Sequence, residues 1–130
     1  MPYALSTTVS RPYADVVEAT RSALADQGFG VLTEIDLAAT LKAKIDAHIA
    51  PQVILGACRP PLAHAAVQAE PSIGLLLPCN VVVRAVDEGS TLVEAMDPAI
   101  MVTLTGNPTL EAVAADARTR LTAALDALSA

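Results

Sequence analysis

Aromatic and basic side chains are both scarce in this 130-residue sequence. Tyr3, Tyr13 and Phe29 are its only aromatic residues. Eight lysine and arginine residues stand against 14 aspartate and glutamate residues, which gives a net charge of −6. Nucleic-acid binding depends on basic side chains that contact phosphates and, for single strands, on aromatic rings that stack on bases. The composition therefore argues against a nucleic-acid-binding protein.

Long apolar runs are also missing, although hydrophobic residues make up 53% of the chain. A membrane-spanning helix needs roughly 20 consecutive apolar residues, and the longest candidate is interrupted at Pro78 and Asn80. Residues 1–6 lack the basic region and apolar stretch of a signal peptide. We therefore expect a cytoplasmic protein without a membrane segment, with a single domain over residues 1–130.

Cysteine occurs only twice, and in the cytoplasm two cysteines are expected to be reduced thiols rather than a structural disulfide. Cys58 ends the apolar run 53–57 and is followed by Arg59-Pro60-Pro61. Cys79 interrupts a second apolar run directly after Pro78. Both thiols therefore lie where strand-like sequence is broken by proline. If the two strands are neighbours, the two sulfurs can share one pocket.

The hydrophobic pattern predicts an α+β fold, a two-layer sandwich of a mixed β-sheet with helices packed on it. The predicted order is β-α-β-α-β-α-β-β-α. Strands are expected at residues 3–9, 29–35, 53–57, 73–86 and 91–96, and helices at residues 11–27, 37–48, 60–70 and 108–128. Ser10, Asp36 and Asn107 are the expected N-caps. Residues 99–106 fit either a strand or a helical turn.

One face of the second predicted strand combines Phe29 with the residues at positions 31, 33 and 35, because side chains alternate along a strand. Glu34 and Asp36 then share the other side, where paired carboxylates could do acid–base work. The structural interpretation is favoured: Asp36 caps the next helix, and Glu34 pairs with Lys42 or Lys44 at the surface.

Three longer motifs carry a family resemblance. They are GFGVLTEID at 28–36, ILGACRPPLAH at 54–64 and GLLLPCNVVV at 74–83. They resemble domain of unknown function family 302 of bacteria and archaea, and the similarity runs from Tyr3 to the last helix. The resemblance implies a compact α+β domain related to the TATA-binding-protein-like sandwiches, often a homodimer, and it implies no reaction. The sequence matches the family pattern at Glu34, Asp36, Lys44, Cys58, Pro60, His64, Pro78, Cys79 and Asn80.

A single ligand-binding site is expected near the two thiols. Its candidate residues are Cys58, His64, Cys79, Asn80, Glu34 and Asp36. Cys58 lies between a strand end and a helix start, where a helix N-terminus favours the thiolate. The two prolines that follow weaken that effect, because they remove N–H donors. In the alternative interpretation, both cysteines are small buried hydrophobic side chains.

Two kinds of chemistry remain open at these residues. Cys58 and His64 are candidate catalytic residues if the imidazole lies within hydrogen-bonding reach and a third polar group orients it. Cys58, Cys79 and His64 could instead bind a soft metal, since thiolate and imidazole suit zinc or copper. Their spacing, however, fits no common zinc motif.

The sequence names no reaction. We expect a non-catalytic domain that binds a small ligand or a partner, needs no cofactor and forms a homodimer. The alternative is a thiol-dependent redox or sulfur-handling protein that uses Cys58 as its reactive sulfur.

Overall fold

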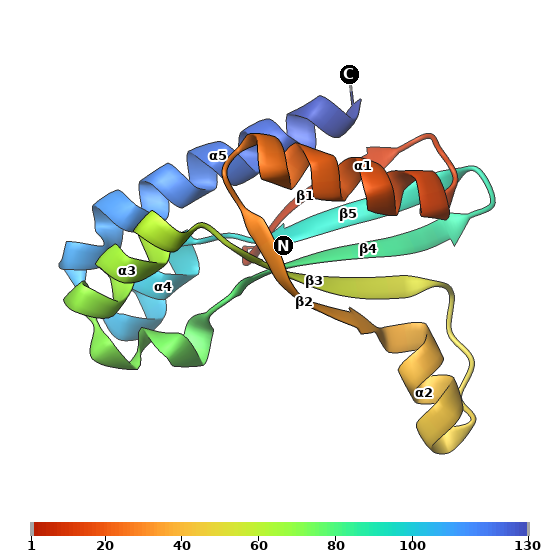
Figure 1. Ribbon diagram of the computed structural model, residues 1–130, viewed down its shortest axis with the longest axis horizontal. Helices are drawn as coiled ribbons and strands as arrows, with labels where there is room; N and C mark the ends of the chain where they lie inside the picture. Colours follow the sequence, from red (N-terminus) through yellow and green to blue (C-terminus); the bar gives the residue numbers. More distant parts are fainter. Residues whose placement is uncertain (1, 130) are drawn as a thin grey trace.

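The computed structural model describes residues 2–129 and has the predicted α+β class and order of elements (Figure 1). Its strands are β1 (Ala4–Val9), β2 (Gly30–Asp36), β3 (Gln52–Cys58), β4 (Cys79–Asp87) and β5 (Ser90–Met96). Its α-helices are α1 (Tyr13–Asp26), α2 (Leu37–Ile45), α3 (Pro60–Ala69), α4 (Ala99–Thr105) and α5 (Glu111–Ser129). Two 3-10 helices, η1 (Pro71–Leu76) and η2 (Pro108–Leu110), complete it. Among these residues, no helix is long and apolar enough to cross a lipid bilayer.

The five strands form one sheet in the order β1-β5-β4-β3-β2, and every neighbouring pair is antiparallel. The prediction of a mixed sheet is therefore wrong, because the sheet contains no parallel pair among the described strands. The strands that flank α1 do not pair at all, because β1 and β2 lie at opposite edges of the sheet. The connections that contain α2 and α3 each return to a neighbouring strand and give antiparallel pairs, as a hairpin does.

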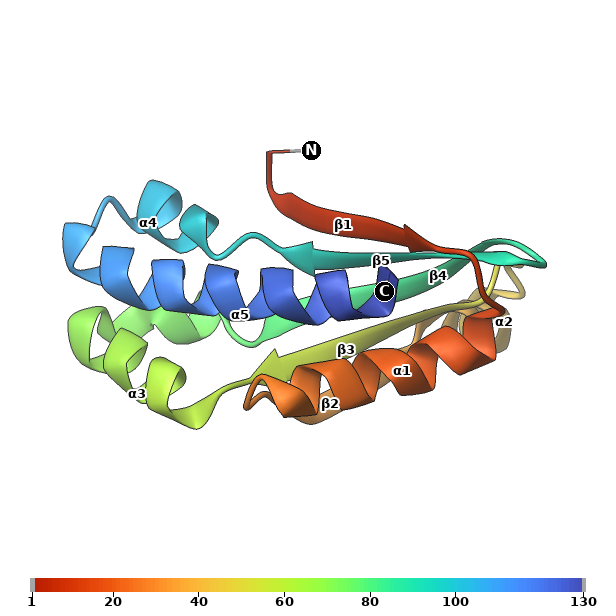
Figure 2. The ribbon, with the colours of Figure 1, turned by 90° about the horizontal axis from the view of Figure 1, so that it is seen from above.

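Helices α1 and α5 lie side by side over one face of the sheet (Figure 2). They bury residues at helical spacing, among them Val16 and Leu24 of α1 and Leu121 and Leu125 of α5. Alternate residues of β3, β4 and β5 are buried beneath them, whereas most side chains of the opposite face are half-buried or exposed. We call that opposite side the open face of the sheet.

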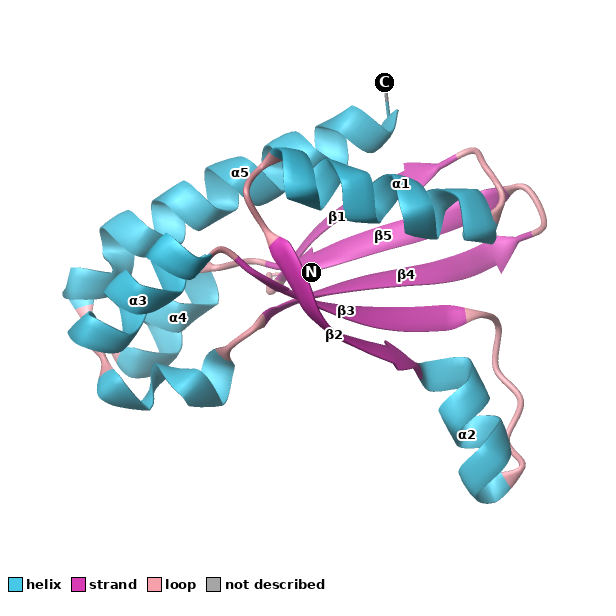
Figure 3. Ribbon diagram, viewed as in Figure 1, coloured by secondary structure: helices cyan, strands magenta, loops and turns pink. Residues whose placement is uncertain are grey.

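At one end of the sheet, α3 and α4 lie beside the first turns of α5 (Figure 3), and a second hydrophobic cluster forms between them. It consists of Ala66, Ile73, Met101, Leu110 and Ala114, contributed by α3, η1, α4, η2 and α5. The strand predicted over residues 73–86 is therefore wrong in its first part: Ile73 belongs to η1 and is only 1% exposed, and β4 begins at Cys79. The ambiguous residues 99–106 form α4 and its C-cap.

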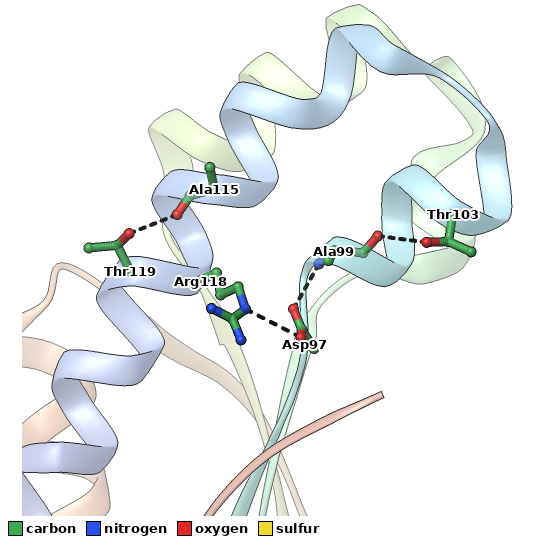
Figure 4. A network of polar contacts seen from close by, with 6 residues as sticks. All are labelled: Asp97, Ala99, Thr103, Ala115, Arg118 and Thr119. Atoms are coloured by element: carbon green, nitrogen blue, oxygen red, sulfur yellow. Dashed lines mark hydrogen bonds and ion pairs between the residues drawn. The ribbon is translucent and has the colours of Figure 1, made fainter. Parts of the chain in front are cut away.

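Polar contacts of Asp97 hold α4 against α5 (Figure 4). One carboxylate oxygen accepts a hydrogen bond from the backbone N–H of Ala99 at 3.0 Å. The other accepts from Nε of Arg118 on α5 at 3.3 Å. Within α4, the Thr103 hydroxyl donates to the Ala99 carbonyl at 3.3 Å. Asp97 thus links the end of β5 to both helices.

The helix starts differ partly from expectation. Asp36 caps α2, as predicted, because its carboxylate accepts from the Ala39 backbone N–H at 2.9 Å. Asn107 also caps as predicted, although it caps η2, which leads into α5. Ser10 does not cap α1, which begins after Pro12 without a side-chain cap.

A bulge in β2 changes which side chains share a face. Val31 lies opposite Ala57, but Thr33 lies opposite Gly56, so one extra residue is inserted between them. The predicted common face of Phe29, Val31, Thr33 and Ile35 is therefore wrong. Phe29 and Val31 pack in the main core, whereas Ile35 lies opposite Ile54 on the open face.

Candidate functional site

A cavity lies where the ends of β3 and β4 meet α3, α4 and α5. Ala57 and Phe29 reach it from the main core beneath α1 and α5, and Ala66 and Met101 reach it from the second cluster. The cavity therefore marks the seam between the two hydrophobic clusters. Its lining is almost wholly apolar.

Both thiols line this cavity. Cys79 lies directly opposite Ala57 in the β3–β4 ladder, and Cys58 follows Ala57 at the end of β3. Neither cysteine is in a disulfide, and Cys58 is half-buried. Cys79 is only 7% exposed, and its burial, with a smaller contribution from Cys58, raises the pKa of its thiol from 9.0 to about 11. Cys79 is therefore protonated at neutral pH.

Arg59 supplies the one charged side chain in the cavity lining. Its Nε atom is buried and has no hydrogen-bond partner among residues 2–129. The side chain lies against Gly28, where a Cβ would come within 3.0 Å of Nε. Gly28 also has a φ of +84°, a conformation that favours glycine. A buried N–H donor without an acceptor costs roughly 1–3 kcal/mol.

The cavity is narrow. It contains about 350 Å³ of space between atoms, the solvent at its mouth included, but the centre of a water-sized molecule can occupy only about 20 Å³. By that second measure a single water needs about 10–15 Å³. With the side chains in their present positions, the volume of about 20 Å³ admits one water molecule or the end of a slender molecule. A longer molecule requires flexible lining side chains such as Met101 and Leu62 to move.

Asn80 and His64 do not line this cavity. Asn80 follows Cys79 on β4, so its side chain takes the opposite side of the sheet. There it lines a shallow hollow of the open face. His64 is exposed on α3, whereas Leu62, Ala63 and Ala66 of the same helix line the cavity.

Glu34 and Asp36 line a separate groove beside α1, together with Tyr13. Glu34 forms an ion pair with Arg21 of α1, instead of the expected Lys42 or Lys44. The pKa of Tyr13 is raised, mainly by burial and further by the charges of Asp36 and Glu34. The six candidate residues are thus distributed over four places: the two cysteines share the cavity, Glu34 and Asp36 share the groove, and Asn80 and His64 lie apart from both pairs.

The arrangement bears on the catalytic and metal-binding hypotheses. Cys58 and His64 form no hydrogen bond with each other among residues 2–129. In the same residues, no group of three or more His, Cys, Asp or Glu side chains is placed to hold a metal ion. The chemistry available in the cavity is that of two thiols, one guanidinium N–H and apolar contact.

Sequence reasoning missed Arg59 and Met101 as residues that line the cavity. A signal for Arg59 was present, since it is the one charged residue in the stretch 53–69. An arginine between two apolar elements either extends its charged group to solvent or leaves an N–H donor buried among apolar side chains. No comparable signal marks Met101, because its helix was itself ambiguous in the sequence.

Comparison with known proteins shows which family the chain is similar to. Residues 5–128 match the family described as "Domain of unknown function DUF302". The chain belongs to the DUF302 family. The crystal structure of an uncharacterized conserved DUF302 protein from Bacillus stearothermophilus has a TM-score of 0.89 with this structure and 30% sequence identity, over 98% of each chain. No curated protein matches the sequence. The predicted family and α+β architecture are confirmed.

Proposed function

We propose that this DUF302 protein is a non-catalytic domain that binds a small ligand in the cavity shared by Cys58 and Cys79. The observation that carries the proposal is the lining itself: apolar walls with the unpartnered Nε–H of Arg59. Ligand sites commonly combine predominantly apolar walls with a few polar groups that fix orientation. A thiol with a raised pKa, such as that of Cys79, adds to the apolar character at neutral pH.

The same features define the class of ligand. The ligand has a slender apolar part that fits the seam between the two hydrophobic clusters, and one acceptor, such as a carboxylate, that accepts from Arg59. Very small ligands gain at most about 1.5 kcal/mol per non-hydrogen atom. At about two-thirds of that ceiling, an acid of four non-hydrogen atoms gains about 4 kcal/mol, so we expect short acids to bind in the millimolar range or somewhat more tightly.

Binding can be tested with n-alkanoic acids of two to six carbons and the corresponding alcohols as probes. Amide chemical shifts in two-dimensional NMR spectra report where each probe binds. We expect saturable shifts at Ala57, Cys58 and Leu62, with the acids stronger than the alcohols. Shifts spread over the surface, or none up to 50 mM of probe, a ceiling about tenfold above the expected millimolar range, would contradict the proposal.

Matched variants on α3 show whether the cavity is responsible. Ala63 is half-buried and lines the cavity, whereas Ala65 is half-buried on the same helix and does not. Ala63→Leu fills the space and should abolish the saturable shifts. Ala65→Leu adds the same volume elsewhere and should preserve them.

Thiol chemistry at Cys58 is the second candidate function. Its support is the position of Cys58, half-buried in the cavity lining with Cys79 as a neighbour. Alkylation rates measured across pH separate the two functions. Fast alkylation of Cys58 well below pH 8 favours a reactive thiol, because the thiolate is the nucleophile. Two slowly reacting thiols favour the ligand-binding function.

We further propose that the protein acts in the cytoplasm and self-associates as a homodimer. The two free cysteines support a reducing compartment. Large apolar side chains at the surface support self-association, since extended apolar patches are rare on monomers. Light scattering over a concentration series tests the second statement, and a strict monomer at high concentration would contradict it.

A further inference from the structure

Helix α2 is the element with the least support from the rest of the molecule. It stands away from the other helices, at the end of β2 (Figure 1). None of its nine residues is buried. Leu37, Leu41 and Ile45 recur every four residues and form an apolar stripe, in which Leu37 and Leu41 are half-buried and Ile45 is 70% exposed. Isolated helices this short are marginal in water, so such a stripe gains stability by being covered.

The charge of α2 is opposite to that of the rest of the chain. Lys42 and Lys44 are the only lysines of the protein. Without their two charges, the net charge of −6 becomes −8 for the remaining residues. Neither lysine forms an ion pair within residues 2–129. Between its capping residues Asp36 and Asp46, α2 is thus a basic and apolar helix on an acidic protein.

The open face of the sheet offers a surface of matching character. Ile54, Val82 and Leu92 give it a half-buried apolar centre. Beside them lies an open hollow with about 630 Å³ of space between atoms, solvent included, and its lining includes Tyr3, Asn80, Val82, Arg84, Glu94 and Met96. Arg84 is already paired with Glu94 at 3.4 Å, which reduces its repulsion of other cations.

Unpaired acids complete this surface. Asp87 and Glu88 are exposed at the turn between β4 and β5, and neither forms an ion pair within the described chain. They lie at the end of the strands that carry Arg84 and Leu92. A basic apolar helix placed on the open face would therefore meet apolar contacts at the centre and carboxylates at the rim.

We propose that α2 of one copy of this chain docks on the open face of a second copy, with its apolar stripe against Val82 and Lys42 and Lys44 near Asp87 and Glu88. The proposal rests on the self-association proposed above and names its surface. In a two-fold dimer, each copy gives one helix and receives one, so the two contacts are equivalent. The arrangement covers both unpartnered apolar surfaces at once.

The test compares dimer dissociation constants by light scattering or sedimentation for three variants. Ile45→Lys alters α2, and Val82→Lys alters the open face. Leu104→Lys is the matched control, because Leu104 is a 66% exposed leucine on α4, away from both surfaces. We expect each of the first two variants to raise the constant at least about tenfold, as substitutions at an interface centre do, and the control to leave it unchanged.

A charge-reversed variant, Lys42→Glu with Lys44→Glu, tests docking without changing apolar packing. It should also weaken the dimer at least about tenfold, and the difference should shrink in high salt. Circular dichroism verifies that each variant is folded. A wild-type monomer would overturn both this proposal and self-association. A dimer that tolerates Ile45→Lys, Val82→Lys or the charge reversal would overturn the docking surface and leave self-association standing.

Discussion

Cys58 and Cys79 line one cavity because Cys79 lies opposite Ala57, the residue that precedes Cys58. Strand pairing alone produces this relationship: the β3–β4 ladder brings together two segments separated by α3 and η1. The cavity persists at this point because the main core and the second cluster meet there without filling the seam.

Gly56 is expected to tolerate no side chain. A Cβ on Gly56 would collide with the Thr33 side chain and come within 2.9 Å of Cγ of Pro78. Gly56→Ala should therefore destabilise the protein by about 1–3 kcal/mol in urea unfolding, the usual cost of overpacking. Gly74→Ala is the matched control, because a Cβ there meets nothing within 4 Å, and it should change stability by less than about 0.5 kcal/mol. Equal effects of the two would contradict this account of Gly56.

Stability should fall between pH 9 and pH 11 because of Cys79. Its pKa is raised in the folded state, to about 11, so the folded protein holds a proton that the unfolded chain has already lost in this range. The contribution is present below the unfolded pKa of about 9.0 and is lost as the pH rises through the folded pKa. Its size is on the order of 2 kcal/mol.

The variant Cys79→Ala isolates this effect. The raised pKa of Tyr13 adds a slope of the same sign in both proteins, so the comparison with wild type removes it. Urea unfolding at several pH values should show a shallower loss of stability in the variant. Parallel curves for the two proteins would show that Cys79 is not desolvated.

Arg59→Met should be neutral or stabilise the ligand-free protein by up to about 1 kcal/mol. The substitution keeps most of the aliphatic stem and removes the buried Nε–H that has no acceptor. It should also erase the preference for alkanoic acids over alcohols in the NMR titration. A loss of stability larger than about 1 kcal/mol would mean that this N–H is satisfied, for example by a bound water.

Asp97→Ala should cost more than Arg118→Ala. Asp97 accepts at the first turn of α4 as well as from Arg118, and losing such an N-terminal acceptor costs about 1 kcal/mol. Arg118 is half exposed, so removing it should cost less than about 0.5 kcal/mol. Thermal unfolding of the two variants gives the ranking, and the reverse order would contradict the role of Asp97.

Local sequence signals predicted most of the fold. The four-residue and three-residue spacing of the last helix, the Asn107 cap of η2 that leads into it and the β4–β5 turn are all encoded over short distances. The direction of each strand was not encoded in this way, because it depends on which strand of the sheet each connection leads to. Likewise, the local sequence predicts that Ile73 belongs to a strand. In the structure it lies in η1, where it packs in the second hydrophobic cluster with residues from distant segments.

For the site, the sequence supported the neighbouring thiols but not their surroundings. The alternation of side chains between the two faces of a strand would have been sufficient to place Asn80 and Cys79 on opposite sides of the sheet. The distance of His64 from the cavity depends on the rotation of α3 about its axis, which its small residues leave undetermined in the sequence. The missing partner of Arg59 is a property of packing and is visible only in three dimensions.

Protection of Cys58 from alkylation tests the central claim most directly. The rate of N-ethylmaleimide reaction at Cys58 is measured by peptide mass spectrometry with and without the alkanoic acid that gives the largest NMR shifts. We expect the acid to slow the reaction in the wild type and in Ala65→Leu, and to have no effect in Ala63→Leu. An alkylation rate that saturating acid leaves unchanged in the wild type would show that the ligand does not occupy the cavity of the two cysteines.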